Sequence, residues 1–204
     1  MISVILNVYK RPYTLESQIE SILNQSVEIK PENIHVWYNP VMGIEQPNPK
    51  DSRIKTYRSS WNTKFFGRFT IPLMCRTKYI AMFDDDVIAG LKSTVPTEVD
   101  LVGHAWFFKQ EHSKYMWTEE PPSWDNGEDM FFSYVAKKHG IPTIVPPHDP
   151  NNVALWSNDP SKDNGWGYDI NAHSLTHNNH ITLRNQIVST LIDKGWKTVK
   201  MRNS

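Results

Sequence analysis

The sequence predicts an α/β fold in which a mostly parallel central sheet is flanked by helices. Within the first 90 residues, short β-rich runs alternate with segments whose apolar residues have helical spacing, which is typical of βαβ units. A length of 204 residues suits about one domain with a sizeable core. The chain has no internal repeat and no low-complexity linker, so we expect a single domain over residues 1–204.

The elements of the first half follow from local patterns. Residues 2–8 form a β-rich apolar run that ends before Lys10-Arg11-Pro12, which predicts a buried strand. Thr14 can cap a helix over residues 15–23, because the apolar residues there recur on one face. The same reasoning predicts strands at 34–38, 54–57 and 79–83, and a helix over 65–75.

The second half is less regular. Its patterns predict a strand over 99–108, a helix over 128–138, a short strand at 143–145 and a closing helix over 183–194. Between the last two lies a long segment rich in Asn, Asp, Pro and Gly, which also carries Trp156, Trp166 and Tyr168. Loops of that length in compact domains tend to be functional or mobile.

Composition excludes several classes of function. Lys plus Arg equals 22 and Asp plus Glu equals 22, so the charge balance gives no sign of nucleic-acid binding. No apolar run approaches the roughly 20 residues that a transmembrane helix needs. A single cysteine, Cys75, excludes an internal disulfide and a multi-cysteine zinc site. Met1 enters a strand-like run without a secretory leader, so we expect a cytoplasmic protein.

The sharpest boundary in the sequence is the point where the apolar run 79–83 meets Asp84, Asp85 and Asp86. Carboxylates at the end of a buried strand resist burial, and a divalent cation is their natural compensation. Strand alternation turns Asp84 and Asp86 to the same side, where hard oxygen ligands suit Mg²⁺ or Mn²⁺. The spacing excludes an EF-hand, and the alternative to a metal site is a solvated acidic turn.

A second acidic motif, Gly127-Glu128-Asp129, precedes the apolar stretch Met130-Phe131-Phe132. Acids in the first turn of a helix are stabilised by the helix dipole and need no catalytic role. A carboxylate at a helix start beside a cleft can also act as a general base toward a hydroxyl group. Both interpretations stay open on this motif alone.

Basic and aromatic residues offer further candidates. Arg68, inside an aromatic segment, is the strongest candidate for contact with an anionic ligand, although a solvated face is the usual fate of Lys and Arg. Late tryptophans can stack on sugar rings, but core packing explains most of them equally well. His173, His177 and His180 lie close together, yet without a Cys or Glu partner they are a weak zinc signal.

Four segments together resemble a GT-A-fold nucleotide-sugar glycosyltransferase of the family 2 or exostosin-like type. They are the first strand and its loop (residues 3–12), Lys64-Phe65-Phe66-Gly67-Arg68-Phe69, Phe83-Asp84-Asp85-Asp86 and Gly127-Glu128-Asp129. The resemblance covers about residues 1 to 140, and the small glycosyltransferase domain that chlorella viruses encode for capsid glycans is also similar. It implies a single GT-A (Rossmann-like) domain, with a nucleotide-binding half over 1–90 and an acceptor and catalytic half over 91–204.

The resemblance also implies roles for individual residues. Asp84-Asp85-Asp86 corresponds to the family's DxD element, in which Asp86 ligates Mn²⁺ or Mg²⁺ and Asp84 or Asp85 holds the ribose or the metal waters. Asp129 matches the acidic position that inverting members use as general base, with Glu128 as its neighbour. The implied nucleotide-sugar contacts are Asn7, Tyr9, Arg11, Asn39, Arg68, Asp84, Asp85 and, by looser likeness, Arg184.

The expected activity is transfer of a hexose from a UDP-sugar, with UDP-glucose as the default, to a hydroxyl of a glycan or glycoprotein acceptor. A cation and an arginine near the diphosphate stabilise the charge that develops on the leaving group. A carboxylate on the opposite face of the sugar takes the acceptor proton, and in-line attack inverts the anomeric centre. Retention is the alternative, because the sequence does not place Asp129 relative to the donor. If the protein is encoded by a virus, its place is the host cytoplasm.

Three rival functions remain. A haloacid-dehalogenase-like phosphatase would use Asp84 as nucleophile, but the motif follows several strands and Ile88 stands where Thr or Val is usual. A non-catalytic module could bind a nucleotide sugar or a glycan without turnover. A metal-dependent nucleotidyltransferase on a similar sheet is the third.

Overall fold

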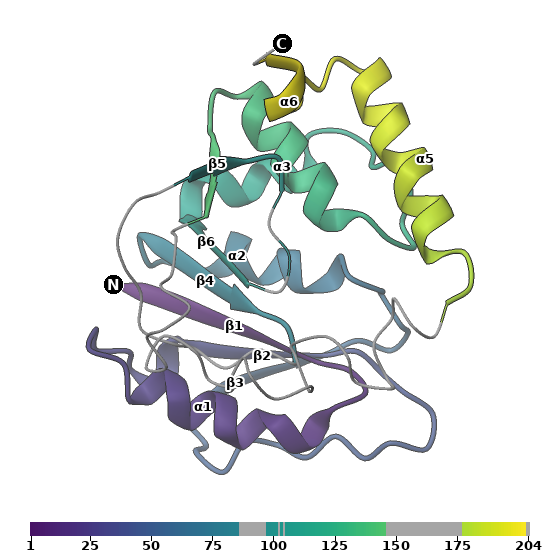
Figure 1. The fold of residues 1–204 in the computed structure, drawn as a ribbon. Coiled ribbons are helices and arrows are strands. Elements are labelled where there is room, and N and C mark those ends of the chain that lie inside the picture. Colours follow the sequence, from purple (N-terminus) through teal and green to yellow (C-terminus); the bar gives the residue numbers. More distant parts are fainter. Residues whose placement is uncertain (86–96, 102, 104, 146–176, 203–204) are drawn as a thin grey trace, which may run out of the picture.

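The computed structural model describes residues 1–85, 97–101, 103, 105–145 and 177–202. A five-stranded sheet with the order β3-β2-β1-β4-β6 lies at its centre (Figure 1). The strands are β1 (Ile2–Val8), β2 (Ile34–Tyr38), β3 (Lys55–Arg58), β4 (Tyr79–Phe83) and β6 (Ala105–Lys109). Strands β1 to β4 run parallel to their neighbours and β6 runs antiparallel to β4, which confirms the predicted mostly parallel α/β sheet.

Helices cover the sheet on both faces. Helix α1 (Leu15–Leu23) lies on one side, and α2 (Ile71–Met74), α3 (Glu128–Lys138) and α5 (His180–Asp193) lie on the other (Figure 1). The short helix α6 (Val199–Arg202) follows α5, and β5 (Thr97–Val99) pairs with β7 (Thr143–Val145) in a small antiparallel sheet. None of the helices in the described ranges combines the length and apolarity that crossing a membrane requires.

Most of the elements expected from the sequence are present. The expected ranges for β1, α1, β2, β4, α3 and β7 agree with the structure, β3 begins one residue late, and α5 begins earlier than expected. The residues of α1 that share a face, Leu15, Ile19 and Ile22, are buried, as the apolar spacing predicts.

Two expectations are wrong. The single strand over 99–108 is two strands in different sheets, because β5 ends at Val99 and pairs with β7, whereas β6 starts at Ala105 and pairs with β4. The helix over 65–75 is shorter, since a 3₁₀ turn over Gly67–Thr70 leads into α2 at Ile71–Met74. Gly67 lies so close to Trp37 that an added Cβ would be 2.4 Å from the indole, so the turn is shaped by close packing.

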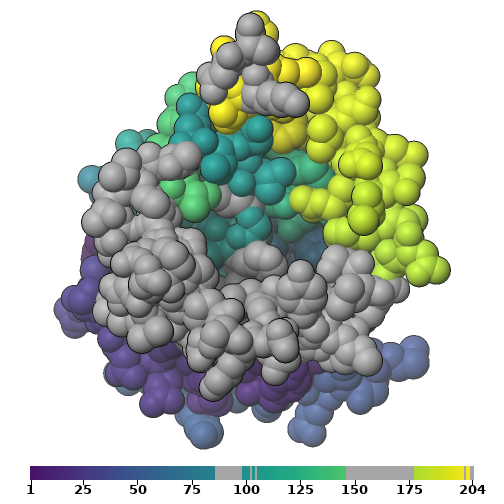
Figure 2. All heavy atoms as spheres, viewed as in Figure 1, coloured from purple at the N-terminus to yellow at the C-terminus, as the bar shows by residue number. Residues whose placement is uncertain are grey.

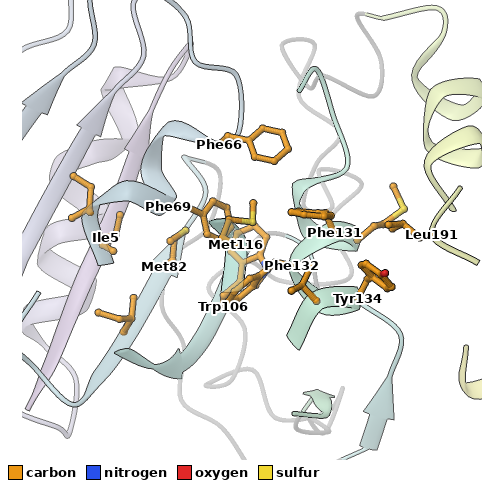
Figure 3. Close-up of a cluster of buried hydrophobic side chains, with 14 of the residues drawn as sticks. Ile5, Phe66, Phe69, Met82, Trp106, Met116, Phe131, Phe132, Tyr134 and Leu191 are labelled. Atoms are coloured by element: carbon orange, nitrogen blue, oxygen red, sulfur yellow. The ribbon is translucent and has the colours of Figure 1, made fainter. Parts of the chain in front are cut away.

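The core consists of one apolar layer on each face of the sheet. Val4, Leu6 and Val8 of β1 pack with the buried residues of α1. Alternate residues of the same strands, such as Ile5 and Met82, point to the other face and meet the aromatic residues of the second layer. Figure 3 shows this second cluster, in which Phe69, Met116, Trp106 and Phe132 lie between the sheet and Phe131, Tyr134 and Leu191. Burying each such side chain stabilises the fold by about 1.5–3 kcal/mol.

Candidate active site at the carboxyl edge of the sheet

The carboxyl ends of the parallel strands bring the candidate residues to one edge of the sheet. Leu6 of β1 pairs with Phe83 at the end of β4, and Val8 pairs with Tyr38 at the end of β2. The loops that follow these strands therefore start side by side. Ligands of open α/β sheets bind at this edge.

Asp85 is held by the loop that follows β1. Its Oδ1 accepts a hydrogen bond from Arg11 Nη1 at 2.7 Å, and its Oδ2 accepts one from the backbone N–H of Tyr9 at 3.3 Å. Thr14 Oγ1 donates to the Asp85 carbonyl at 2.8 Å, so this loop is bound to the backbone of the residue as well. Asp85 and Arg11 are both buried, which makes the pair a link between the β1 and β4 loops.

Asp84 belongs to a different pair. Its Oδ1 accepts a hydrogen bond from Nη1 of Arg68, and Nη2 of the same guanidinium donates to Glu128 Oε1 at 3.1 Å. Arg68 is 1% exposed, so it bridges two carboxylates inside the protein. The carbonyl of Asp84 accepts a hydrogen bond from Gln18 Nε2 of α1 at 2.6 Å, which fixes the end of β4 from the other face.

Burial and charge change the ionisation of this bridge. Burial, followed by the negative charge of Asp129, raises the pKa of Glu128 to about 7, while Arg68 acts in the opposite direction. Burial also lowers the pKa of the Arg68 guanidinium, against the effect of the nearby carboxylates. Glu128 therefore titrates near neutral pH, where a carboxylate can act as a proton acceptor.

Asp129 pairs with a residue of α5. Arg184 donates from Nη1 to Asp129 Oδ1 at 3.2 Å and from Nη2 to Asp129 Oδ2 at 2.7 Å. The same Nη1 lies 3.1 Å from Asn126 Oδ1, and Asn126 Nδ2 lies 3.0 Å from Nδ1 of His180. Both oxygens of Asp129 are thus occupied by a guanidinium that α5 positions.

The start of α3 places the two acids side by side. Gly127 is the N-cap residue and has a φ of 82°, a left-handed conformation that favours glycine. Its N–H donates to Asn126 Oδ1 at 2.6 Å. Glu128 and Asp129 then occupy the first turn of α3, where the helix dipole favours negative charge, and both are buried.

The remaining expected nucleotide contacts lie around the ends of β1 and β2. Asn7 is half-buried on the face of β1 that carries Ile5, and the Tyr9 hydroxyl accepts a hydrogen bond from Asn62 Nδ2 at 3.2 Å. Asn39 is buried, and its side chain binds the loop at 63–64. It accepts a hydrogen bond from Thr63 Oγ1 at 2.7 Å and donates one to the Lys64 carbonyl at 2.6 Å. Asn39 therefore fixes this loop from the interior of the protein.

Several expectations lie outside the described residues. They concern Asp86, Trp156, Trp166, Tyr168, His173 and Ile88. Within the described ranges, no three His, Cys, Asp or Glu side chains gather closely enough to hold a metal ion. Of the two aspartates of the triplet that the structure describes, Asp85 accepts hydrogen bonds through both carboxylate oxygens. Asp84 accepts one through Oδ1, and its Oδ2 has no hydrogen-bond partner among the described residues.

Two further residues shape the site through contacts that the sequence did not predict. Trp106 lies beneath the bridge, with its ring centroid 4.7 Å from the Arg68 guanidinium carbon. Asn126 links Arg184, His180 and Gly127 around Asp129. The signal for Asn126 is its place directly before a glycine that starts a helix, and Trp106 had no signal beyond being aromatic.

A hollow in the surface is visible in a space-filling view. Figure 2 shows a depression bordered by teal atoms from the middle of the chain and by the yellow-green atoms of α5. Helix α5 contributes Arg184, which reaches Asp129 from that side. The acidic start of α3 is therefore approached by α5 on one side and by Arg68 on the other.

Comparisons with known proteins give likenesses to solved structures. No family model matches the sequence, and no curated protein matches it. The solved structure of the mannosyltransferase PcManGT from Pyrobaculum calidifontis, in complex with GDP-Man and Mn2+, is similar over 72% of this chain, with 14% sequence identity and a TM-score of 0.46. The chain spans 55% of the length of that mannosyltransferase.

Proposed function

We propose that this chain is a metal-dependent glycosyltransferase. It transfers a hexose from a UDP-sugar, with UDP-glucose as the default donor, to a hydroxyl of a glycan or glycoprotein acceptor, with inversion at the anomeric carbon. The observation that carries this proposal is that Asp84, at the end of a parallel strand, and Glu128, at the start of a helix, are held by the same Arg68. Asp84 is a carboxylate of the kind that binds cations, and Glu128 titrates near neutral pH. Arg68 thereby makes the two neighbours at the edge of the sheet where ligands bind.

The acidic residues after β4 suit a divalent cation in part. Asp84 Oδ2 has no hydrogen-bond partner among the described residues, and the side chain is 24% exposed, so this oxygen can serve as a hard ligand. Asp86 is the proposed second ligand by its place in the sequence. Asp85 fits a structural role better, because Arg11 and Tyr9 occupy its carboxylate. When bound, Mn²⁺ or Mg²⁺ would neutralise the diphosphate of the donor.

The loops after β1 and β2 are the proposed nucleotide pocket. Tyr9 and Asn7 offer polar groups at the end of β1, and Arg11 and Asn39 hold the two loops in place through Asp85 and Thr63. A pocket with polar groups fixed in advance binds with a smaller loss of conformational entropy than a mobile one. Selectivity for the nucleotide depends on these rim residues in this proposal.

Glu128 is the proposed base, in preference to Asp129. The acceptor hydroxyl attacks the anomeric carbon, its proton passes to a carboxylate, and the bond from the anomeric carbon to the diphosphate breaks, releasing UDP. Glu128 Oε1 accepts the hydrogen bond from Arg68, and the pKa of Glu128 near 7 suits proton transfer at neutral pH. Asp129 would first have to release Arg184.

Calorimetric titration tests the donor site directly. UDP and UDP-glucose are titrated into the protein with Mn²⁺, with Mg²⁺ and with EDTA, and hydrolysis of UDP-glucose is then followed by UDP release. We expect metal-dependent binding of both ligands, loss of the metal dependence in Asp84→Asn, and unchanged binding in Asp51→Asn, which alters a half-buried carboxylate paired with Arg53. Absence of binding under all metal conditions would overturn the proposal and favour the phosphatase alternative.

A further inference from the structure

Arg68 is too deeply buried to contact a ligand at the protein surface. It is 1% exposed, and its guanidinium carbon lies 4.7 Å from the Trp106 ring centroid and 5.7 Å from that of Phe69. The sequence suggested that it approaches the base or the phosphates of a nucleotide. With aromatic rings against its face and carboxylates at two of its nitrogens, this side chain serves the interior of the site instead.

The two carboxylates that Arg68 binds come from distant parts of the chain. Asp84 follows β4 and Glu128 begins α3, and Arg68 itself lies in the turn before α2. A buried guanidinium is costly unless its N–H groups are paired, and the same is true of the carboxylates. The planar fork of arginine also fixes the direction of each hydrogen bond, which the single ammonium of lysine does not.

We propose that Arg68 is a positioning residue that couples the cation side of the site to the acceptor side. By binding Asp84 through Nη1 and Glu128 through Nη2, it sets the two carboxylates relative to each other. A change in the charge of Glu128 then alters how strongly Arg68 holds Asp84. This inference rests on the function proposed above.

The coupling is measurable without turnover. In Glu128→Gln, Arg68 loses one charged partner and binds Asp84 more strongly, so Asp84 becomes a poorer ligand. We expect the affinity for UDP in the presence of Mn²⁺ to fall by about threefold or more in this variant. In an Arg68→Met background, the same Glu128→Gln change has only its direct electrostatic effect, so the fall is smaller.

The experiment is a double-mutant cycle on Mn²⁺-dependent UDP affinity, measured by calorimetry. It compares the unaltered protein, Glu128→Gln, Arg68→Met and the double variant, with Arg53→Lys as a control at an exposed ion pair. Circular dichroism and thermal unfolding establish that each variant is folded. If Arg68→Met does not fold, Arg68→Lys takes its place in the cycle, because lysine keeps the charge but cannot hold both carboxylates in the same geometry.

Each outcome decides the inference. A smaller effect of Glu128→Gln in the Arg68 variant background supports coupling through Arg68. An equal effect in both backgrounds overturns the coupling and leaves the proposed glycosyltransferase function standing. Absence of Mn²⁺-dependent UDP binding in the unaltered protein overturns the proposed function and this inference with it.

Turnover gives a second readout. We expect Arg68→Lys to lower kcat more than it raises KM for the donor, since misplaced groups act on the reaction step more than on ground-state binding. A purely structural role would lower the unfolding temperature and leave kcat per folded molecule unchanged. That result would overturn the positioning role.

Discussion

The carboxylate of Asp129 is held by the guanidinium of Arg184 through two hydrogen bonds, of 2.7 and 3.2 Å. The two residues stand on α3 and α5, so this pair attaches the last long helix to the first turn of the helix that carries Glu128. Asp129 is 6% exposed, and a buried carboxylate that loses its partner is strongly unfavourable. The pair therefore stabilises the arrangement of α3 and α5.

Replacing Arg184 tests this role. We expect Arg184→Gln to lower the free energy of unfolding by about 1–3 kcal/mol, because Asp129 is left without its charged partner. Urea denaturation measures the change. The double variant Arg184→Gln with Asp129→Asn should recover part of the loss, since it leaves no unpaired charge. A double variant less stable than Arg184→Gln alone would contradict this account.

The choice of base is decided by two isosteric substitutions. We expect Glu128→Gln to lower kcat by about 10²- to 10⁴-fold, as loss of a general base commonly does. Asp129→Asn should have a smaller effect on kcat, because Arg184 already occupies both of its oxygens. Rates of UDP release at saturating donor give the comparison. The reverse order would assign the base to Asp129, as the family resemblance implied.

The raised pKa of Glu128 gives opposite pH trends for activity and stability. Its pKa is about 7 in the folded protein and has an ordinary value of 4.5. The folded state therefore binds more protons between those values, and this group's contribution to stability falls as pH rises from about 4.5 to about 7. Activity rises over the upper part of the same range as Glu128 ionises.

Glu128→Gln is the control for both trends. We expect the variant to lose the decrease in unfolding temperature between pH 5 and about 7 that Glu128 causes. Thermal unfolding across this range, beside the pH dependence of kcat in the unaltered protein, measures the two effects. An unchanged pH dependence of the unfolding temperature would show that Glu128 does not titrate there.

A buried histidine predicts sensitivity to acid. Burial and, to a lesser extent, Lys55 lower the pKa of His35 to about 4, and its Nδ1 lies 3.1 Å from the Tyr57 hydroxyl. The unfolded state then binds more protons than the folded state between about 4 and 6.5, so this stabilisation is present above 6.5 and is lost as pH falls through 4. We expect His35→Gln to flatten the stability profile in that window, measured by denaturation, with the exposed His139→Gln as control.

Two glycines with similar backbone conformations allow the cost of backbone strain to be measured apart from the cost of overpacking. Gly127 and Gly140 have φ values of 82° and 75°, but only at Gly127 would an added Cβ meet a neighbour, 2.7 Å from Ile187 Cδ1. We expect Gly140→Ala to cost about 1–2 kcal/mol for the left-handed backbone. Gly127→Ala should cost about 1–3 kcal/mol more for overpacking. Equal losses of unfolding free energy in the two variants, measured by urea denaturation, would mean that α5 moves away from the added methyl group at position 127 without cost.

The elements that the sequence predicted well are those with an unambiguous period. Residues 15–23 carry apolar side chains on one helical face, and residues 79–83 form a short apolar run before charged residues. Residues 99–108 have an apolar and aromatic pattern that suits a strand throughout. Their division between two sheets depends on the partners β4 and β7, which the local pattern does not contain.

For the candidate site, the sequence predicted which residues carry suitable chemistry better than which residues bind each other. Asp84, Glu128 and Arg68 were recognisable because charged residues stood beside apolar runs. Arg68 and Glu128 are 60 positions apart, and no local rule pairs them. Arg184 was expected near a diphosphate or base, whereas in the structure its partners are Asp129 and Asn126. Such pairings arise from packing of α3 between the sheet and α5, which is a tertiary property.

The position of Cys75 makes the protein convenient for spectroscopic labelling. It is the single cysteine of the sequence and is 8% exposed, its Sγ lies 3.7 Å from His35 Nε2, and burial raises the pKa of its thiol. A protonated and inaccessible thiol reacts slowly with maleimide or nitroxide reagents. A cysteine introduced at an exposed position, such as Ser60 or Trp61 in the segment after β3, can therefore carry a probe while the native thiol stays in place.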